Sequence, residues 1–270
     1  MSEYNATVTL RVNLTAELMV LRLELDGEPF AFEPGQYTVL GLRRASPRIT
    51  ESEPDLAELA AGPGDPMIRR AYSITSNSHE RELEFVVSLV RSGSLTPRLF
   101  ALQEGGRIHV EPRATGLFTL KSSSGNRDLL LVATGSALAP YISMLRSVFP
   151  QNPEHQYVVV HAASVSWDLA FRSQLEAFAG SSKHFTYVPV ITDPGRDRSW
   201  QGLVGNVEKL IADGEIEDQL GLPISPDRFD VFLSGSPAMI DAVVPVLVER
   251  GFHPGDPDSV DTNLHVERYW

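Results

Sequence analysis

The sequence predicts two domains of different class: a six-stranded antiparallel β-barrel, followed by an α/β domain with a doubly wound parallel sheet. Up to about residue 122, short runs rich in Val, Leu, Ile, Tyr, Phe and Thr are separated by turn residues, which is typical of antiparallel strands. From residue 123 onward, apolar strands alternate with helices, which favours a parallel sheet covered on both faces. The 270 residues are enough for two such domains.

The first domain, residues 1–122, is expected to contain six strands and one long insertion. Turn signals such as Pro34-Gly35 and Glu104-Gly105-Gly106 separate the strands. The strands are expected at residues 6–14, 16–25, 36–42, 71–75, 82–90 and 106–110, and this number of short strands suggests a small closed barrel. The insertion, residues 45–66, is rich in Pro, Gly, Asp and Glu around a short helical pattern at 55–60. It is interpreted as either a disordered excursion or a loop with a task.

The second domain, residues 123–270, is expected to alternate strands with helices. The strands are expected at residues 128–133, 156–162, 184–191 and 229–233. The helices are expected at residues 137–148, 167–178, 204–211 and 237–250. Pro245 lies inside the last helix, and its missing N–H group and its ring should kink that helix or end it early.

A basic, aromatic and hydroxyl-bearing run, Arg70-Ala71-Tyr72-Ser73, is the first candidate binding site. The Arg70 guanidinium can bind a phosphate through two parallel hydrogen bonds. Tyr72 offers a flat ring for stacking, and Ser73 adds a small donor and acceptor beside it. These three groups fit a flavin nucleotide. An ordinary surface strand with Tyr72 half-buried explains the same residues, because Tyr, Ile and Thr favour strands in any case.

Three turns are candidate parts of a binding site. In Ser94-Leu95-Thr96-Pro97, Thr96 is expected to cap a helix, and free N–H groups there would bind an anion. Thr134-Gly135 follows the first strand of the α/β domain, where doubly wound sheets bind a pyrophosphate. Ser234-Gly235 follows a later strand, with Met239 nearby, and could close over the crevice that such a sheet forms at the carboxyl ends of its strands. Each turn alone is also compatible with an ordinary helix cap or an ordinary strand-to-helix turn.

The composition excludes several classes of function. The absence of cysteine rules out disulfides, thiolate catalysis and a resident iron–sulfur cluster, so an iron-bearing electron carrier would be a separate partner. The net charge of −12 argues against binding to nucleic acid or to an anionic membrane. The N-terminus lacks a signal-peptide pattern and no run of about eighteen apolar residues occurs, which predicts a cytoplasmic protein.

The histidines and arginines give weaker indications. No pair of the seven histidines has metal-ligand spacing, so no metal site is expected; only His161 falls near the predicted crevice. Several arginines of the first domain form a basic subset, which is either solvated surface or a docking patch for an acidic partner. They are Arg43, Arg44, Arg48, Arg69, Arg70, Arg91, Arg98, Arg107 and Arg113.

Six motifs occur in order along nearly the whole chain. They are Arg70 to Ser73, Gly93 to Leu99, Ala133 to Pro140, His161 to Ala163, Ser234 to Met239 and Val266 to Trp270. Together they resemble the bacterial ferredoxin–NADP reductase family, of the flavodoxin/ferredoxin reductase type. The resemblance implies an FAD-binding barrel, an NADP-binding α/β domain and hydride transfer between nicotinamide C4 and flavin N5. It also implies single-electron transfer to ferredoxin or flavodoxin, a transient acidic partner, and we expect a monomer.

The resemblance implies a role for each matching residue. Arg70 would hold the FAD phosphates, Tyr72 would stack on the isoalloxazine, and Ser73 would hydrogen-bond near flavin N5, with Ala71 in the same binding run. The pyrophosphate loop would be lined by Ser94, Leu95 and Thr96. The terminal aromatics, Tyr269 and Trp270, would fold back against the FAD.

The nicotinamide side follows in the same way. The residues implied to hold NAD(P) are Thr134, Gly135, Gly235 and Met239. Ser73, Ser234 and Glu267 would be the catalytic residues that orient the reacting rings. Ser234 stands where the family usually has a cysteine, so hydride transfer is expected to be slower or differently gated.

A second departure concerns the adenosine end of the dinucleotide. Where NADP-specific relatives place three arginines, this chain has Ser164 or Val165, then Asp193, then Leu203. A carboxylate repels a 2′-phosphate and suits a ribose 2′-hydroxyl, so we expect weak NADPH selectivity or a preference for NADH. Arg196 and Arg198 follow closely and could restore phosphate binding.

Two alternatives to the ferredoxin or flavodoxin reductase stay open. One is an NADH-dependent reductase component of an oxygenase, which the missing arginines favour and the missing fused iron–sulfur domain disfavours. The other is a non-catalytic flavin- or nucleotide-binding subunit, which could keep Arg70 and Tyr72 yet lose hydride transfer through Ser234.

Overall fold

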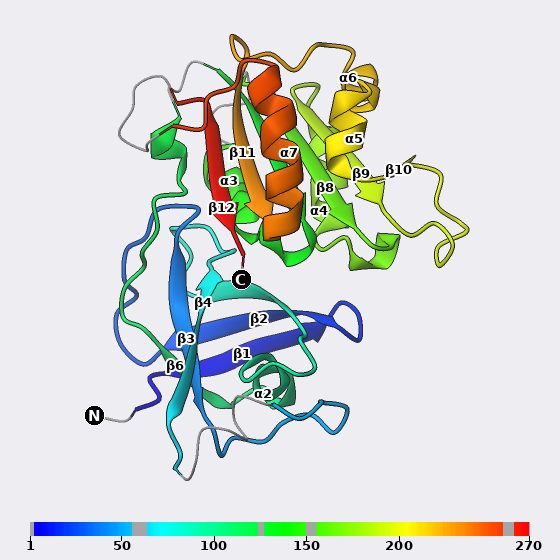
Figure 1. Cartoon of the computed structure of the whole chain (residues 1–270). Coiled ribbons are helices and arrows are strands. Elements are labelled where there is room, and N and C mark those ends of the chain that lie inside the picture. The colour runs from blue at the N-terminus through cyan, green and yellow to red at the C-terminus, as the bar shows by residue number, and fades with distance from the viewer. Residues whose placement is uncertain (1–2, 56–63, 124–126, 150–154, 256–261, 270) are drawn as a thin grey trace. The chain divides into compact units, whose positions relative to one another are not determined.

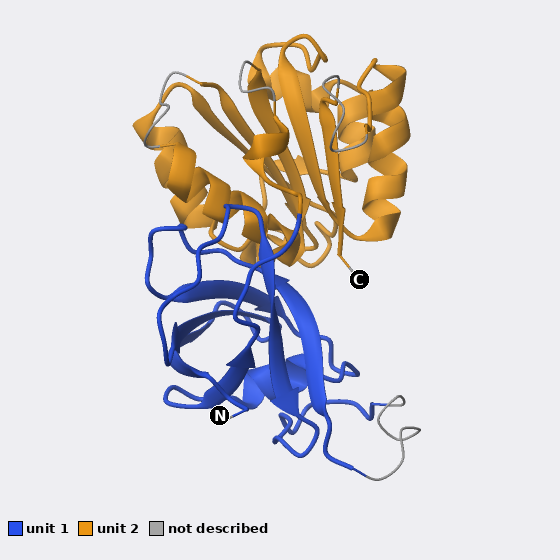
Figure 2. Cartoon of the chain, turned by 90° about the vertical axis from the view of Figure 1, so that its left-hand side faces the viewer, with its two compact units in different colours: residues 1–116 blue, residues 117–270 orange. Residues whose placement is uncertain are grey.

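The computed structural model describes residues 3–55, 64–123, 127–149, 155–255 and 262–269 (Figure 1). The chain divides into two compact units, Met1–Gly116 and Leu117–Trp270 (Figure 2). This division falls a few residues before the boundary that we place at 122/123. The helical pattern expected at 55–60 lies outside the described residues except for Asp55.

Unit 1 is an antiparallel six-stranded sheet in the order β4-β3-β6-β1-β2-β5. Its strands are β1 (Ala6–Asn13), β2 (Leu18–Leu25), β3 (Tyr37–Arg43), β4 (Met67–Ser73), β5 (Leu83–Ser88) and β6 (Arg107–Val110). Just after β4, the Thr75 N–H donates to the Glu84 carbonyl of β5 at 2.8 Å, so the two edge strands of the sheet are linked. The inward side chains, such as Leu21, Leu40 and Phe85, form one apolar core. The predicted barrel class is confirmed.

Two local predictions in unit 1 are wrong. β4 begins at Met67 rather than at residue 71, because it pairs along its length with β3, with Arg70 opposite Leu40. Helix α2 (Thr96–Ala101) has Leu95 as its N-cap residue and no side-chain cap. Thr96 instead donates its hydroxyl to the Val90 carbonyl and accepts from the Val90 N–H, both at 3.0 Å, so its side chain holds the end of the preceding segment.

Unit 2 contains a six-stranded parallel sheet in the order β10-β9-β8-β7-β11-β12. Its strands are β7 (Asp128–Thr134), β8 (Tyr157–Ala163), β9 (Phe185–Ile191), β10 (Leu203–Val204), β11 (Phe229–Gly235) and β12 (Leu264–Arg268). The chain runs from β7 outward to β10 and then returns to the other side of β7 with β11. The predicted doubly wound sheet is therefore confirmed, with its topological switch point between β7 and β11.

Helices cover both faces of this sheet, as Figure 1 shows. Leu130 and Val132 of β7 pack with residues of α5 (Val207–Ala212) and α7 (Pro237–Glu249), whereas Leu129 and Leu131 pack with residues of α3 (Ala139–Val148) and α4 (Arg172–Ser181). The remaining short helices are η1 (Leu120–Ser122), η2 (Gly135–Leu138), η3 (Ser166–Asp168) and α6 (Glu215–Leu220). Within the described residues, no helix has the length and apolar character needed to span a bilayer.

Some helix boundaries differ from the predicted ones. The helix expected at 167–178 begins only at Arg172, because η3 and Phe171, with a left-handed φ of 55°, precede it. Helix α7 continues through Pro245 to Glu249, so the predicted early end is wrong. Pro245 and Asp241 are exposed, so water can satisfy the Asp241 carbonyl that receives no N–H bond. The helix expected at 204–211 begins only at Val207, because residues 203–204 form β10. Strands β10 and β12 and helix α6 were not predicted.

Candidate functional site

Strand β4 presents the first group of candidate residues in unit 1. Arg69, Arg70 and Ala71 are exposed, Ser73 is buried, and Tyr72 is half-buried against the barrel core. One Arg70 Nη donates to the Arg69 carbonyl at 2.8 Å. Burial raises the pKa of the Tyr72 phenol, so its ring stays uncharged at neutral pH. An exposed guanidinium thus lies two residues from a neutral aromatic ring on one edge strand.

The loop before α2 presents the second group. Within the described residues, the backbone N–H groups of Ser94, Leu95 and Thr96 have no hydrogen-bond acceptor. The Gly93 and Ser94 carbonyls, in contrast, accept from guanidinium groups at 3.1 and 2.5 Å. Unpaired amides beside bonded carbonyls suit an anion such as a phosphate. The anion site rests on these amides, because α2 is only six residues long.

In unit 2, the carboxyl ends of β7 and β11 meet at the switch point of the sheet. A Cβ added to Gly235 would lie 2.5 Å from the Thr134 hydroxyl and 2.4 Å from the Met239 methyl group. These three predicted residues are therefore brought together, and only a glycine allows it. Gly135, at the start of η2, has a φ of 55° and open space where a side chain would be. A ligand can therefore approach its backbone closely.

Ser234 and Glu267 lie side by side at the same edge. They are direct partners in the parallel pairing of β11 with β12, so their side chains share a face of the sheet. Ser234 is fully buried, and neither its Oγ nor Glu267 Oε2 has a hydrogen-bond partner among the described residues. Burial raises the pKa of Glu267 to about 7, because the ionised carboxylate is poorly solvated there. The site thus holds a carboxyl group that can gain or lose a proton near neutrality.

His161 supports the Thr134-Gly135 turn from β8. Its Nε2 lies 3.0 Å from the Gly135 carbonyl, and because a carbonyl only accepts, Nε2 carries the hydrogen. The ring is fully buried, and burial lowers its pKa to about 4, so it is neutral at physiological pH. Nδ1 is then an acceptor, and it has no partner among the described residues. His161 was predicted only to lie near the predicted crevice; the structure gives it a contact with the Thr134-Gly135 turn.

Two residues that were predicted to lie at the adenosine end of the dinucleotide, Ser164 and Asp193, also lie together. The Asp193 N–H donates to the Ser164 carbonyl at 2.9 Å, and the Asp193 carboxylate accepts from the Arg196 N–H at 3.2 Å. Val165 is fully buried and Leu203 packs against the core, so neither faces a ligand. Arg196 and Arg198 are exposed, and their guanidinium groups have no partner among the described residues. Asp193 therefore supplies the polar side chain next to Ser164, and this side chain is a carboxylate.

Asp197 fixes the loop that carries these arginines. It is buried, and it accepts from the Ser166 N–H at 3.0 Å and from the Ser199 hydroxyl at 2.9 Å. The hydrogen bonds from Ser166 hold the pKa of the Asp197 carboxyl below its usual range. The loop after β9 is thereby tied to η3, which follows β8.

The remaining predicted residues are placed as follows. Tyr269 is half-buried, and its N–H donates to the Gly235 carbonyl at 2.9 Å, which continues the pairing of β12 with β11. Trp270 lies outside the described residues. The proposed catalytic set is divided between units: Ser73 belongs to unit 1, whereas Ser234 and Glu267 belong to unit 2. The apolar–polar alternation of Leu264 to Arg268 is a strand signal that the sequence analysis missed.

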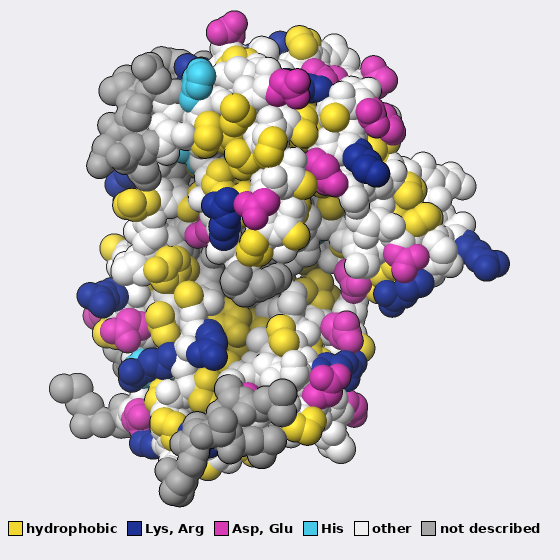
Figure 3. Space-filling model, in the orientation of Figure 1, with side chains coloured by type: hydrophobic (Ala, Val, Ile, Leu, Met, Phe, Trp, Pro, Cys, Tyr) yellow, Lys and Arg dark blue, Asp and Glu magenta, His cyan; other side chains and the backbone are white. Residues whose placement is uncertain are grey.

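The basic subset of unit 1 is not one solvated patch. Arg98 is only 2% exposed, and Arg48, Arg91 and Arg107 are bound to carbonyl or carboxylate groups of unit 1. Arg69 and Arg70 are exposed. On the face shown in Figure 3, Lys and Arg side chains are interspersed with Asp and Glu.

Comparison with known proteins identifies the family. The model of the oxidoreductase NAD-binding domain matches residues 131–244. The flavodoxin/ferredoxin–NADP reductase of Escherichia coli (strain K12) is 30% identical over 233 residues, which cover 86% of this chain and 85% of that protein. The chain belongs to the flavodoxin/ferredoxin–NADP reductase family. The predicted resemblance is therefore confirmed.

Two further similarities bear on this reductase. A ferredoxin NADP+ reductase from Neisseria gonorrhoeae, solved with bound FAD and NADP, has the same fold, with a TM-score of 0.82, 22% identity and 99% of each chain covered. The electron transfer component of toluate 1,2-dioxygenase from Pseudomonas putida is 28% identical over 189 residues, covering 69% of this chain and 52% of that protein.

Proposed function

We propose that this chain is an FAD-dependent reductase that transfers electrons between NAD(P)H and ferredoxin or flavodoxin. The observation that carries the proposal is the switch point of the parallel sheet. There Thr134, Gly235 and Met239 converge, and the neighbouring Ser234 Oγ and Glu267 Oε2 are left without partners in the described structure. Buried polar atoms without partners are costly, and a ligand that pairs them removes the cost. Family membership supports a nicotinamide dinucleotide as that ligand.

Unit 1 supplies residues that fit FAD. Arg70 would bind a phosphate, the neutral Tyr72 ring would stack on the isoalloxazine, Ser73 would bond near its N5, and Ala71 leaves the strand surface open between them. The unpaired N–H groups of Ser94, Leu95 and Thr96 match the oxygens of the diphosphate. Bound FAD would supply the hydride and one-electron chemistry of the reaction.

Unit 2 supplies residues that fit the nicotinamide dinucleotide. The open backbone at Thr134-Gly135 suits the diphosphate, and Gly235 and Met239 border the same turn. Ser234 Oγ can donate to or accept from the carboxamide of the nicotinamide. Glu267 can hold a proton on its carboxyl at pH values below about 7 and lose it above. Tyr269 and Trp270, at the end of β12, are proposed to contact the flavin.

We propose that NADH is used at least as well as NADPH. Ser164 and Asp193, which are hydrogen-bonded neighbours, offer a hydroxyl and a carboxylate to the adenosine ribose. A carboxylate accepts from a ribose hydroxyl and repels a 2′-phosphate. Arg196 and Arg198 are the cations that would counter this repulsion. The electron carrier would be an acidic protein, and the reductase would act as a monomer.

The similarity to the toluate dioxygenase component, together with Asp193, supports a second candidate: an NADH-dependent reductase that serves an oxygenase. In that case the iron–sulfur carrier would be a separate chain, because this one has no cysteine. The two candidates share the flavin and nicotinamide sites and differ only in the electron acceptor.

The test is the visible spectrum of the purified protein under anaerobic conditions, followed by stopped-flow mixing with NADPH or NADH. Rapid bleaching of a flavin band is expected. A yellow protein bleached by neither cofactor would indicate the non-catalytic subunit, and a colourless protein that takes up no FAD would overturn the proposal.

The same experiment tests the cofactor preference. A preference for NADPH above about a hundredfold, equivalent to roughly 2.7 kcal/mol, would refute the role given to Asp193. If Asp193 has this role, Asp193→Ser should raise kcat/KM for NADPH relative to that for NADH. Arg198→Ala is the matched variant in the same loop, and it should lower this ratio if Arg198 binds the 2′-phosphate.

A further inference from the structure

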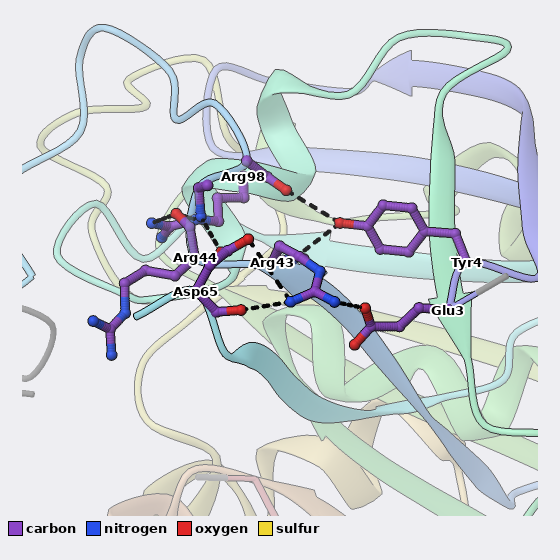
Figure 4. A network of polar contacts seen from close by, with 8 residues as sticks. Glu3, Tyr4, Arg43, Arg44, Asp65 and Arg98 are labelled. Atoms are coloured by element: carbon purple, nitrogen blue, oxygen red, sulfur yellow. Dashed lines mark hydrogen bonds and ion pairs between the residues drawn. The ribbon is translucent and has the colours of Figure 1, made fainter. Parts of the chain in front are cut away.

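The first part of the insertion is an ordered support of unit 1. Its two ends are joined, because the Arg44 N–H donates to the Pro66 carbonyl at 3.0 Å and the Ala45 N–H donates to Asp65 Oδ1 at 2.7 Å. Arg43 binds both Asp65 and Glu3 at the same place (Figure 4). Residues 45–55 are thus held against unit 1 by hydrogen bonds, and a task for this loop stays a prediction.

This segment contacts the loop at residues 91–98 through main-chain atoms. The Ile49 N–H donates to the Pro97 carbonyl at 3.1 Å, and the Glu53 N–H donates to the Arg91 carbonyl at 2.9 Å. From the loop side, buried Arg98 donates to the Arg44 carbonyl from Nε at 3.1 Å and from Nη2 at 2.5 Å.

Arg48 is the centre of this contact. Its Nη1 donates to the Gly93 carbonyl at 3.1 Å, and its Nη2 donates to the Arg91 carbonyl at 3.3 Å. The same guanidinium also donates to the Glu53 carbonyl at 2.6 Å and to the Ser52 hydroxyl at 3.2 Å. Arg98 Nη1 binds the next carbonyl of the loop, that of Ser94, at 2.5 Å. Two guanidinium groups therefore hold the carbonyls of the 93–94 and 94–95 peptide units.

The planarity of the peptide bond gives these contacts a consequence. In a trans peptide unit the C=O and the following N–H point in opposite directions, and the described chain contains no cis peptide bond. With the Gly93 carbonyl held by Arg48, the Ser94 N–H must point away from the guanidinium. With the Ser94 carbonyl held by Arg98, the Leu95 N–H must do the same. These are the N–H groups that have no acceptor in the described structure.

We propose that Arg48 is a positioning residue for FAD: it fixes the peptide units whose N–H groups bind the diphosphate. The inference rests on the proposed function, in which the 94–96 loop holds that diphosphate. Arg48 acts through the backbone, and its positive charge lies behind the carbonyl oxygens, where it reinforces the positive potential at the N–H ends of the peptide dipoles. The insertion thus serves cofactor binding within unit 1.

The experiment compares the affinities of the full chain for FAD and for riboflavin, which has no phosphate, by flavin fluorescence. Arg48→Ala should weaken FAD binding by about tenfold, as expected for the loss of a charged hydrogen bond, and leave riboflavin binding unchanged. Arg48→Gln, which keeps one donor and no charge, should have a smaller effect and provides a folded alternative. Arg107→Ala is the control, because Arg107 also binds a main-chain carbonyl and side chains of unit 1, but at β6. It should lower Tm without changing FAD affinity.

Arg70→Ala separates the inference from the proposed function. If Arg70→Ala leaves FAD affinity unchanged, or if the chain binds no FAD, the flavin site itself is misassigned. If Arg70→Ala weakens FAD binding but both Arg48 variants bind FAD as the parent does, the positioning role is refuted. Equal weakening of FAD and riboflavin by the Arg48 variants would also refute it, because a general loss of structure would then explain the effect.

Discussion

Replacing Glu267 with glutamine should change how the stability of the protein depends on pH. The pKa of Glu267 rises from 4.5 to about 7 on folding, which makes its ionised form less favourable in the folded state by about 3 kcal/mol at 1.36 kcal/mol per pKa unit. Between these pH values the folded state keeps a proton that the unfolded state has released. The free energy of unfolding contributed by Glu267 therefore falls as pH rises from 4.5 to 7.

The glutamine side chain of the Glu267→Gln variant does not titrate. The stability of the variant minus that of the parent should therefore rise by up to about 3 kcal/mol between pH 4.5 and pH 7.5. Urea unfolding at a series of pH values, followed by tryptophan fluorescence, measures this difference in unit 2, because all three tryptophans lie there.

Glu249→Gln is the matched control for Glu267→Gln. Glu249 is exposed at the end of α7, so its variant controls for the loss of one carboxylate at the surface. A difference curve that does not rise for Glu267→Gln would refute the assignment of a carboxyl group whose ionised form is poorly solvated in the folded state. The parent's stability must be subtracted at each pH because His161 changes that stability with the opposite sign over nearly the same range of pH.

Three further variants test the rest of unit 2. His161→Gln keeps a donor for the Gly135 carbonyl but has no titrating ring. Because folding lowers the pKa of His161 from 6.5 to about 4, the stability of this variant relative to the parent should fall by about 3 kcal/mol as pH rises from 4 to 6.5. A relative stability that rises over this range would contradict the prediction. Gly235→Ala should lower the free energy of unfolding by about 1–3 kcal/mol, because the added methyl group overpacks the site, and it should weaken NAD(P)H binding. Gly180→Ala is the control: the methyl group meets open space in α4 and should raise the free energy of unfolding by about 0.5 kcal/mol. Urea unfolding measures both changes. Arg127→Ala removes the ion-pair partner of the fully buried Asp230, at 3.0 Å, and should lower the free energy of unfolding by about 3 kcal/mol. Arg172→Ala removes an exposed ion pair and should lower it by less than 1 kcal/mol. Equal losses would show that Asp230 is stabilised without Arg127.

The fold was predictable where apolar runs report burial directly. The central strands of unit 2 were placed within a residue or two, because β7 and β11 are buried on both faces and read as continuous apolar runs. The start of β4 was placed too late, because the consecutive Arg69 and Arg70 give only a weak local strand signal and are extended by pairing with β3. Such pairing joins residues distant in the sequence, which no local pattern reports.

The candidate site was predictable in its residues but not in its hydrogen bonds. Thr134 was expected on one turn and Gly235 and Met239 on another that borders the same crevice, and both Thr134 and Met239 lie close to Gly235. Thr96 was expected to cap α2, but its hydroxyl bonds to Val90 instead. Arg48 was grouped with surface arginines, because a sequence does not show which backbone carbonyls will surround a guanidinium.

The placement of the unpaired polar atoms links the stability of unit 2 to its function. Five buried side-chain atoms of unit 2 have no partner among the described residues, and three of them, Ser234 Oγ, Glu267 Oε2 and His161 Nδ1, belong to residues near the carboxyl ends of β11, β12 and β8. The other two are Tyr187 Oη and His265 Nε2. Leaving a buried polar atom unpaired costs about 1–3 kcal/mol. A core built for stability alone would place apolar groups at these positions. We propose that the nicotinamide dinucleotide pairs such atoms when it binds, so that this stability cost becomes binding free energy.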